Sequence, residues 1–194
     1  MIRLILLRHG ATAGNLERRY VGRTDEPLCE TGVRQILALR GHGLYAGRLF
    51  VSPMLRARQT ARLLFPDLSP TIVRGLAETD FGVFEGRSAD ELSGCCAYRR
   101  WVDGGCLGPI PGGESPGQFK ARCRSAFARA VHTVPDGVPA AFVIHGGVIM
   151  ALLEAYALPR RDFYRCHIGN GGYVLADWNQ NVLRIVTVFR GAQP

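Results

Sequence analysis

Leu4-Ile5-Leu6-Leu7-Arg8-His9-Gly10-Ala11-Thr12-Ala13-Gly14-Asn15 joins an apolar run of strand length to a cation, an imidazole and a glycine. The pattern predicts a buried strand over residues 3–7 and a loop over residues 8–15. Open α/β sheets bind their ligands at the carboxyl ends of their strands. We therefore expect charged chemistry at this edge of a sheet.

Outward from this stretch, short apolar runs alternate with segments of helical spacing. Strands are predicted at 48–51, 71–74 and 140–144, helices at 30–44, 54–65, 115–134 and 148–157, and a hairpin at 172–177 and 182–189. This order predicts an α/β fold, a three-layer α/β/α sandwich with a mostly parallel central sheet. We expect one domain over residues 1–194, with an irregular, lid-like insertion around 86–113 that contains a short amphipathic piece at 89–101.

The basic residues are nearly all arginine. The chain has 24 Lys and Arg against 16 Asp and Glu, a net charge of +8, and Lys120 is the only lysine. Guanidinium groups match phosphate oxygens in geometry, so the bias fits a phosphorylated ligand. A GC-rich genome explains the bias equally well. Because the arginines are scattered rather than gathered in one block, we expect no nucleic-acid partner.

The six cysteines show no Cys-x-x-Cys spacing, so they do not indicate a zinc site. The first residues hold no apolar run long enough for export or for crossing a membrane. We therefore expect reduced thiols, a cytoplasmic location and no membrane partner. The sequence does not indicate an oligomeric state.

A second predicted strand, at 140–144, also ends in His-Gly, at His145-Gly146. If both strands are central and parallel, His9 and His145 lie on the same edge of the sheet. Such a pair suits metal ligation, acid–base catalysis or nucleophilic catalysis. The remaining histidines do not follow strands, whereas Arg8 and Arg56 lie near the predicted strand ends. Because cations repel a metal ion and attract an oxyanion, we expect no metal and a phosphate pocket built with backbone N–H groups around Gly10.

Four segments then carry a specific resemblance. Residues 8–15 (RHGATAGN), 52–61 (SPMLRARQTA), 76–86 (LAETDFGVFEG) and 143–149 (VIHGGVI) resemble, in order, the motifs of the histidine phosphatase superfamily, the phosphoglycerate-mutase-like proteins. The resemblance spans the chain and implies the phosphoglycerate-mutase-like form of the predicted sandwich.

The resemblance also implies roles for individual residues. His9 is expected to be the nucleophile, Arg8, Arg56 and His145 to hold the phosphoryl oxygens, and Glu78 to transfer the proton, with Glu85 as an alternative donor. Substrate-binding roles are implied for Asn15, Gly10, Thr12, Gly22 and Gly146. The resemblance implies no metal and no cofactor, because arginines neutralise the phosphate.

The implied activity is a phosphomonoesterase acting on a small phosphorylated metabolite through a phosphohistidine. Residues 19–28, 78–86 and 111–115 are similar to the loops of α-ribazole phosphatases, which makes α-ribazole 5′-phosphate one candidate beside a sugar phosphate or a nucleotide. A cofactor-dependent phosphoglycerate mutase and an inactive phosphate-binding module are the alternatives. The aromatic residues Phe84, Tyr98, Trp101 and Phe119 suit either a lid over an aromatic leaving group or ordinary packing.

One position departs from the family pattern. Cys29 stands at the start of the first long predicted helix, where relatives often carry Thr or Ser. A hydroxyl there would cap the helix, and a thiol caps poorly. We expect this departure to affect local stability and not catalysis.

Overall fold

Apolar side chains on the strands build one central sheet. The structure, a computed structural model, describes residues 1–191 of the chain. The strands of the sheet are β1 (Ile2–Arg8), β2 (Arg48–Val51), β3 (Thr71–Ile72), β4 (Ala140–Ile144), β5 (Ala157–Leu158), β6 (Tyr173–Asn179) and β7 (Val182–Phe189). Across the sheet their order is β3-β2-β4-β1-β6-β7-β5. Within this part of the chain only β6 runs against the others, so the prediction of a mostly parallel sheet is confirmed.

The register between β1 and β4 positions the two His-Gly segments. The strands pair in parallel from Leu4 opposite Ala140 to Arg8 opposite Ile144. The next rung continues the ladder, because the backbone N–H of His9 donates to the carbonyl of Ile144 over 3.1 Å. Both histidines therefore leave the sheet at the same level of its carboxyl edge.

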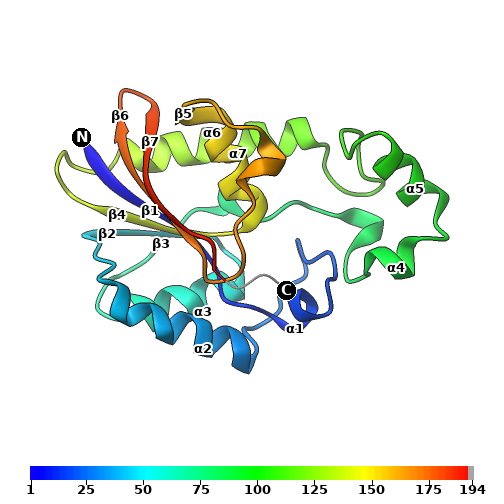
Figure 1. Cartoon of the computed structure of the whole chain (residues 1–194), viewed down its shortest axis with the longest axis horizontal. Coiled ribbons are helices and arrows are strands. Elements are labelled where there is room, and N and C mark those ends of the chain that lie inside the picture. Colours follow the sequence, from blue (N-terminus) through cyan, green and yellow to red (C-terminus); the bar gives the residue numbers. More distant parts are fainter. Residues whose placement is uncertain (192–194) are drawn as a thin grey trace.

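Two pairs of helices cover the sheet (Figure 1): α2 (Glu30–Ala38) and α3 (Leu55–Leu64) on one face, α6 (Pro116–Val131) and α7 (Gly146–Tyr156) on the other. Ile5 and Leu7 of β1 face the first pair, and Leu4 and Leu6 face the second. This alternation follows from the two-residue repeat of a strand, and with apolar residues on both sides it requires cover on both. The predicted three-layer α/β/α arrangement is confirmed.

Element boundaries differ from the sequence prediction at several places. The loop predicted over residues 8–15 contains the start of the short helix α1 (Ala13–Leu16). The first long helix stops at Ala38 and continues as a short 3-10 turn over Leu39–His42, and the predicted strand at 71–74 is only Thr71–Ile72. The amphipathic piece at 89–101 forms two helices, α4 (Ala89–Leu92) and α5 (Cys96–Asp103). The last long helix begins earlier than predicted, directly after His145, which is its N-cap residue.

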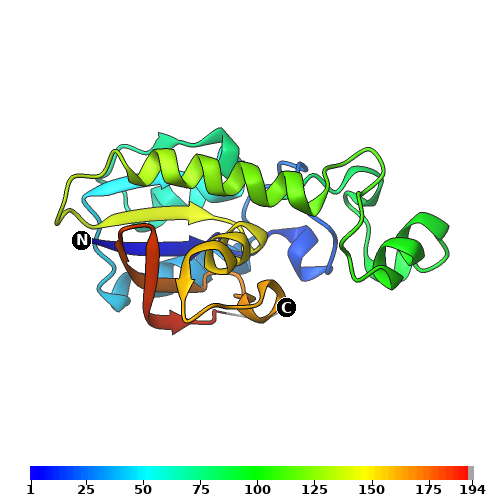
Figure 2. The same cartoon turned by 90° about the horizontal axis from the view of Figure 1, so that it is seen from above.

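The segment 86–113 lies beyond the carboxyl edge of the sheet, next to the short helix α1 (Ala13–Leu16) (Figures 1 and 2). Its residues Leu92, Tyr98 and Ile110 form a small apolar cluster with Phe84, which precedes the segment. Tyr20 ties this cluster to the body, because its hydroxyl lies 2.9 Å from that of Tyr98. The segment therefore stands over the edge where both histidines emerge. No helix within residues 1–191 is both long and apolar enough to cross a membrane.

Cys29 is the N-cap residue of α2, and its side chain makes no capping hydrogen bond, in agreement with the departure noted in the sequence. Its extended backbone, with φ −80° and ψ 170°, already has the N-cap conformation. Cys29→Ser is expected to stabilise the protein by about 1 kcal/mol, because the hydroxyl can accept a backbone N–H of the first turn. Urea denaturation checks this, with the exposed Cys96→Ser as control. A stability equal to or below that of the unsubstituted protein would contradict it.

Candidate active site

His9 lies at the end of β1 with a fixed ring orientation. The side chain is 3% exposed, and its Nδ1 lies 2.7 Å from the carbonyl oxygen of Gly10. A carbonyl only accepts, so Nδ1 carries the proton and Nε2 keeps its lone pair. Nε2 lies 3.3 Å from Nε of Arg56. Nε–H of Arg56 donates to this lone pair, so the nitrogen that could attack lies directly beside a guanidinium.

The surroundings of His9 favour its neutral form. Burial lowers its pKa well below the ordinary value, and the charges of Arg56 and Arg8 lower the pKa further. The hydrogen bond to Gly10 acts in the opposite direction and is the smaller effect. A neutral imidazole is the nucleophilic form, so the site keeps His9 ready to react.

This environment predicts how the ring titrates. Because the pKa is lowered, the neutral ring persists as pH falls through 6.5, where an unperturbed histidine takes up its proton. In an NMR titration of the ring nitrogens, we expect His9 to show the Nδ1–H form from about pH 8 to below 6.5. A midpoint at or above the ordinary value, or a proton on Nε2, would contradict the geometry.

His145 ends β4 next to His9, and the two ring centroids are 5.0 Å apart. Its Nε2 lies 2.6 Å from Oγ of Ser52, which also accepts the N–H of Met54. In the tautomer in which the Ser52 hydroxyl donates to Nε2, the proton of His145 lies on Nδ1. Nδ1 is buried and has no hydrogen-bond partner within the described residues 1–191. His145 is thus a buried donor beside the nucleophile, and burial, followed by the charge of Arg56, lowers its pKa well below the ordinary value.

The two arginines are held by backbone carbonyls. Arg56, fully buried on α3, donates to the carbonyls of Thr24 and Gly22, each over 2.8 Å. Arg8 donates from one terminal nitrogen to the carbonyl of Ile168 over 2.7 Å, and its Nε is buried without a partner among residues 1–191. Burial lowers the pKa of both guanidiniums, and the charge of Glu78 partly restores both. The site therefore concentrates fixed positive charge that a bound anion would neutralise.

Glu78 supplies a nearly buried carboxylate opposite the arginines, 9% exposed. One oxygen accepts the N–H of Gly147 over 3.0 Å, at the start of α7, and the other accepts the N–H of Thr79 over 2.9 Å. The glycine at 147 leaves room for this contact, since a Cβ there would lie 2.5 Å from a carboxylate oxygen. The carboxyl group is therefore held in place beside the N-terminus of α7.

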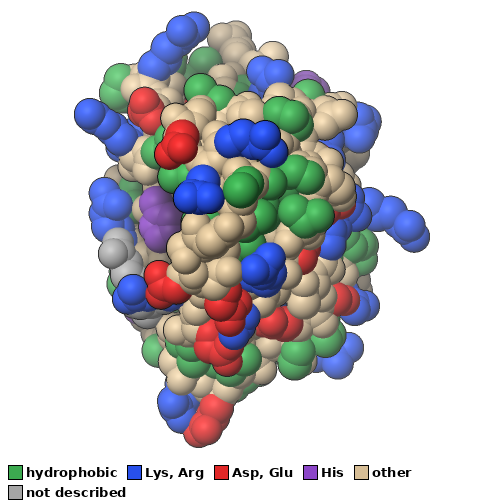
Figure 3. Space-filling model, turned by 90° about the vertical axis from the view of Figure 1, so that its right-hand side faces the viewer, with side chains coloured by type: hydrophobic (Ala, Val, Ile, Leu, Met, Phe, Trp, Pro, Cys, Tyr) green, Lys and Arg blue, Asp and Glu red, His purple; other side chains and the backbone are tan. Residues whose placement is uncertain are grey.

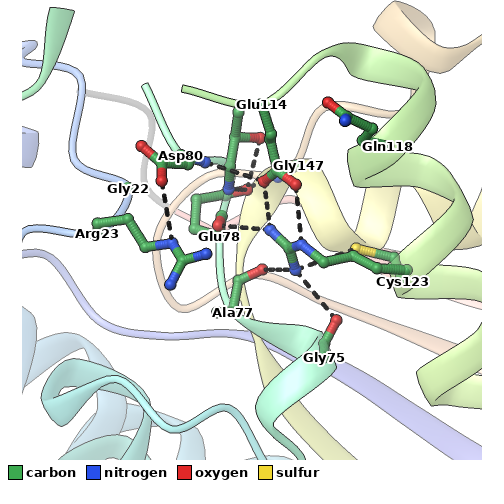
Figure 4. A network of polar contacts seen from close by, with 12 residues as sticks. Gly22, Arg23, Gly75, Ala77, Glu78, Asp80, Glu114, Gln118, Cys123 and Gly147 are labelled. Carbon is green, nitrogen blue, oxygen red and sulfur yellow. Dashed lines mark hydrogen bonds and ion pairs between the residues drawn. The ribbon is translucent and has the colours of Figure 1, made fainter. Parts of the chain in front are cut away.

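A network centred on Arg122 holds the loop that carries Glu78 (Figure 4). Arg122, on α6, donates to the carbonyls of Gly75, Ala77 and Glu78 over 3.1, 2.7 and 2.8 Å. It also binds both carboxylate oxygens of Glu114. One guanidinium thus fixes three backbone groups along the segment that leads into the site.

Removing this guanidinium is expected to weaken the fold. Arg122→Met leaves three carbonyls and the Glu114 carboxylate without their donor, which should cost about 2–3 kcal/mol of unfolding free energy. The measurement is urea denaturation, with the exposed Arg124→Met on the same helix as the matched control. A loss no greater than that of the control would show that the loop is held by other contacts.

A cavity of about 470 Å³ opens over this cluster. Arg8, Asn15, Glu78 and Gly147 line one end of it. His9, Arg56 and His145 do not line it, in agreement with their burial. The other end is lined by the rings of Tyr20, Phe81, Trp101, Phe163 and Tyr164, whereas the ring of Phe119 lies next to Gly147. The cavity therefore joins a polar, cationic end to a largely aromatic one.

The predicted substrate-binding residues divide into two groups. Asn15 lines the cavity and Gly146 lies against the Arg8 guanidinium. Gly10, Thr12 and Gly22 hold the surrounding loops instead. The N–H of Gly10 donates to Oγ1 of Thr60 over 3.1 Å, and the substrate-binding role of Gly10 stays a prediction.

Thr12 and Gly22 serve the loops in different ways. Thr12 is fully buried and caps α1 through reciprocal hydrogen bonds with Asn15. Gly22 allows close packing, since a Cβ there would lie 1.8 Å from the carbonyl of Thr79. Glu85, the alternative proton donor, accepts four backbone N–H groups and the hydroxyl of Thr24, so it acts as a clamp between two loops.

Two residues that hold the site in place, Ser52 and Asn170, were not predicted from the sequence. Ser52 orients His145. It directly follows β2, just as His9 follows β1 and His145 follows β4, and this position could have indicated its role in the site. Asn170 donates to the carbonyl of His9 and to Oδ1 of Asn15 over 3.2 and 3.0 Å. No local pattern marks Asn170, because only the folded chain brings it to the site. Within residues 1–191, His, Cys, Asp and Glu form no group of three or more that could hold a metal ion.

The site thus combines an α/β sheet edge with a neutral imidazole, two buried arginines, a second imidazole and a carboxylate, the equipment of an enzyme that handles phosphoryl groups. The sequence pattern of the histidine phosphatase superfamily (branch 1) matches residues 4–190. The chain belongs to this superfamily, as its four motifs indicated.

Individual relatives agree in fold and differ in name. The chain is 33% identical to "Probable phosphoglycerate mutase GpmB" of Enterobacter sp. (strain 638), over 92% of this chain and 88% of that protein. A crystal structure from Escherichia coli K-12, described as a candidate alpha-ribazole-5′-P phosphatase, superposes with a TM-score of 0.86 at 26% identity, covering 97% and 96% of the two chains. A phosphoglycerate mutase from Thermus thermophilus superposes with a TM-score of 0.73 at 31% identity, covering 97% and 98%.

Proposed function

We propose that this protein is a phosphomonoesterase that works through a phosphohistidine on His9. The observation that carries the proposal is the neutral His9 ring, whose unprotonated Nε2 accepts a hydrogen bond from Nε of Arg56 over 3.3 Å. Family membership supports a phosphatase or mutase activity. The buried cations and the nucleophile beside them favour chemistry at phosphorus.

In the first step, Nε2 of His9 forms a bond to phosphorus as the bond from phosphorus to the ester oxygen breaks. Arg8, Arg56 and the Nδ1–H of His145 offset the charge on the three equatorial oxygens. Because these groups supply the neutralisation, the proposed step uses no metal and no cofactor. The Gly10 carbonyl stabilises the ring as it becomes positively charged, by accepting from Nδ1.

Glu78 handles the proton in both steps. Its carboxyl group gives a proton to the departing alkoxide, and the resulting carboxylate then takes one from the water that attacks the phosphohistidine. The second step releases phosphate and restores neutral His9 and protonated Glu78. The backbone N–H of Gly147 holds this carboxyl in place throughout.

For the substrate, we propose a small phosphate ester, with α-ribazole 5′-phosphate as one candidate. The name of the Escherichia coli structural relative and the aromatic end of the cavity support this choice. We propose a cytoplasmic, single-domain enzyme without a nucleic-acid partner. On the face that carries the segment 86–113, basic and acidic side chains are interspersed with apolar ones and form no single basic block (Figure 3), which suits a small-molecule partner.

Phosphoglycerate mutase is the second candidate, and the names of several relatives favour it. A mutase would hold the phosphohistidine long enough to return the phosphoryl group to the other hydroxyl of the substrate. Isomerisation of 3-phosphoglycerate that depends on a bisphosphoglycerate primer would support this activity. Phosphate release without isomerisation would remove it.

The proposed function is tested by two measurements on the purified full chain. The protein in EDTA should release phosphate from p-nitrophenyl phosphate, and rapid quenching should trap an acid-labile phosphoryl group on His9. Absence of hydrolysis for every ester tried, or a labelled protein with an acid-stable phosphate, would overturn the proposal.

A further inference from the structure

Besides Arg8, two long basic side chains line the cavity, namely Arg19 and Lys120. A phosphate ester with a second anionic group would extend toward them when its phosphoryl group reaches His9. Whether these cations are available to bind that second group therefore decides which esters the site accepts. Their availability depends on the ion pairs that they already form.

Arg19 is already shared between two carboxylates. Its Nε lies 2.6 Å from Glu17, and its two terminal nitrogens lie 2.7 and 2.9 Å from Glu91. The same guanidinium also donates to the carbonyl of Gly86 over 2.6 Å. With two acidic partners for one cation, this corner of the cavity carries no surplus positive charge.

The charge of Lys120 is neutralised by the carboxylate of Glu154, which does not line the cavity. Its Nζ lies 2.9 and 2.8 Å from the two carboxylate oxygens of Glu154, one helix away on α7. It also lies 4.5 Å from the centroid of the Phe163 ring. Lys120 lines the cavity and Glu154 does not, so the carboxylate cancels the charge without occupying the space where a substrate binds.

Besides Arg8, Arg19 and Lys120, no Lys or Arg among residues 1–191 lines the cavity. The rings of Tyr20, Phe81, Trp101 and Tyr164 offer flat apolar surface at the aromatic end. Transferring a carboxylate or a second phosphate from water into such surroundings is unfavourable unless a free cation meets it. An uncharged alcohol with a ring gains contact area there instead.

We propose that Glu154 determines specificity by neutralising Lys120, so that the cavity accepts phosphate monoesters of uncharged, ring-bearing alcohols and discriminates against esters with a second anionic group. This inference rests on the proposed phosphomonoesterase function. Glu154 is a specificity residue that acts through Lys120 and touches no substrate. Restoring the charge of Lys120 should therefore change the choice of substrate and leave the chemistry alone.

The experiment compares phosphate release from 1-naphthyl phosphate and 3-phosphoglycerate by the full chain and its variants. The unsubstituted protein should prefer 1-naphthyl phosphate by roughly tenfold or more in kcat/KM. Glu154→Gln should lower KM for 3-phosphoglycerate roughly two- to fivefold, the size of an exposed charge contact, with kcat unchanged. KM for 1-naphthyl phosphate should stay the same, and the double variant Lys120→Gln/Glu154→Gln should lose the gain.

The control is Glu30→Gln, which breaks the exposed ion pair with Arg34 on α2, far along the chain from both residues. A Glu154→Gln variant that affects both esters alike, or that gains nothing on 3-phosphoglycerate, overturns the inference, as does a preference of the unsubstituted protein for 3-phosphoglycerate. In those cases hydrolysis itself still supports the phosphomonoesterase. If neither ester is hydrolysed, the proposed function fails as well.

Discussion

His9→Ala is expected to lower kcat/KM for p-nitrophenyl phosphate by about 10⁴-fold or more and to abolish the acid-labile phosphoryl group on the protein. The substitution removes the only nitrogen in the proposed mechanism that bonds to phosphorus. Arg56, which lies 3.3 Å from that nitrogen, would still bind an anion, so phosphate should remain a ligand of the variant. Steady-state kinetics and quench labelling measure the loss of chemistry separately from the loss of binding.

The matched control is His132→Ala, which removes an exposed imidazole at the end of α6 and should leave turnover unchanged. Thermal denaturation of both variants distinguishes lost chemistry from lost folding. If His9→Ala folds and keeps more than a few per cent of the activity, another group is the nucleophile, and the mechanism is wrong.

Glu78→Gln should give a loss that depends on the leaving group. For an alkyl ester, whose alkoxide needs a proton as it departs, kcat/KM should fall by about 10²–10⁴-fold. For p-nitrophenyl phosphate the fall should be much smaller, because nitrophenolate leaves without protonation. The amide keeps one oxygen to accept the N–H of Gly147, which limits any structural effect.

Glu85→Gln serves as the comparison for this variant. Since Glu85 accepts five loop donors, its substitution should lower stability and reduce activity on both esters by the same factor. An equal loss on both esters for Glu78→Gln would remove Glu78 as the proton donor. A leaving-group dependence for Glu85→Gln would transfer that role to Glu85.

The layers of the fold and the position of the site could be predicted from short-range sequence patterns. The apolar runs before Arg8 and before His145 are enough to indicate buried strands, and parallel strands bring their ends to one edge. Boundaries were less accurate where tertiary contacts decide them. His145 caps α7 because the chain turns at the end of β4, which starts the helix at Gly146 rather than at 148.

The parts of the site that sequence did not indicate depend on contacts between distant segments. Asn170 reaches His9 and Asn15 only after β6 pairs with β1, and Arg122 holds the Glu78 loop only after α6 packs on the sheet. The same holds for the pairing of Lys120 with Glu154. These interactions have no periodicity, so residue spacing cannot reveal them. The bond from the Gly10 N–H to Thr60 is of the same kind, since Thr60 lies on another element.

The parallel pairing of β1 with β4 has a kinetic consequence. It joins the first strand of the chain to one that is synthesised late, and closing so long a loop is an entropically costly, slow event in folding. His9 and His145 meet only when that event is complete. In a refolding experiment, catalytic activity should therefore return with the last cooperative phase, later than helix formation reported by far-UV circular dichroism, and a nascent chain that ends before β4 should be inactive.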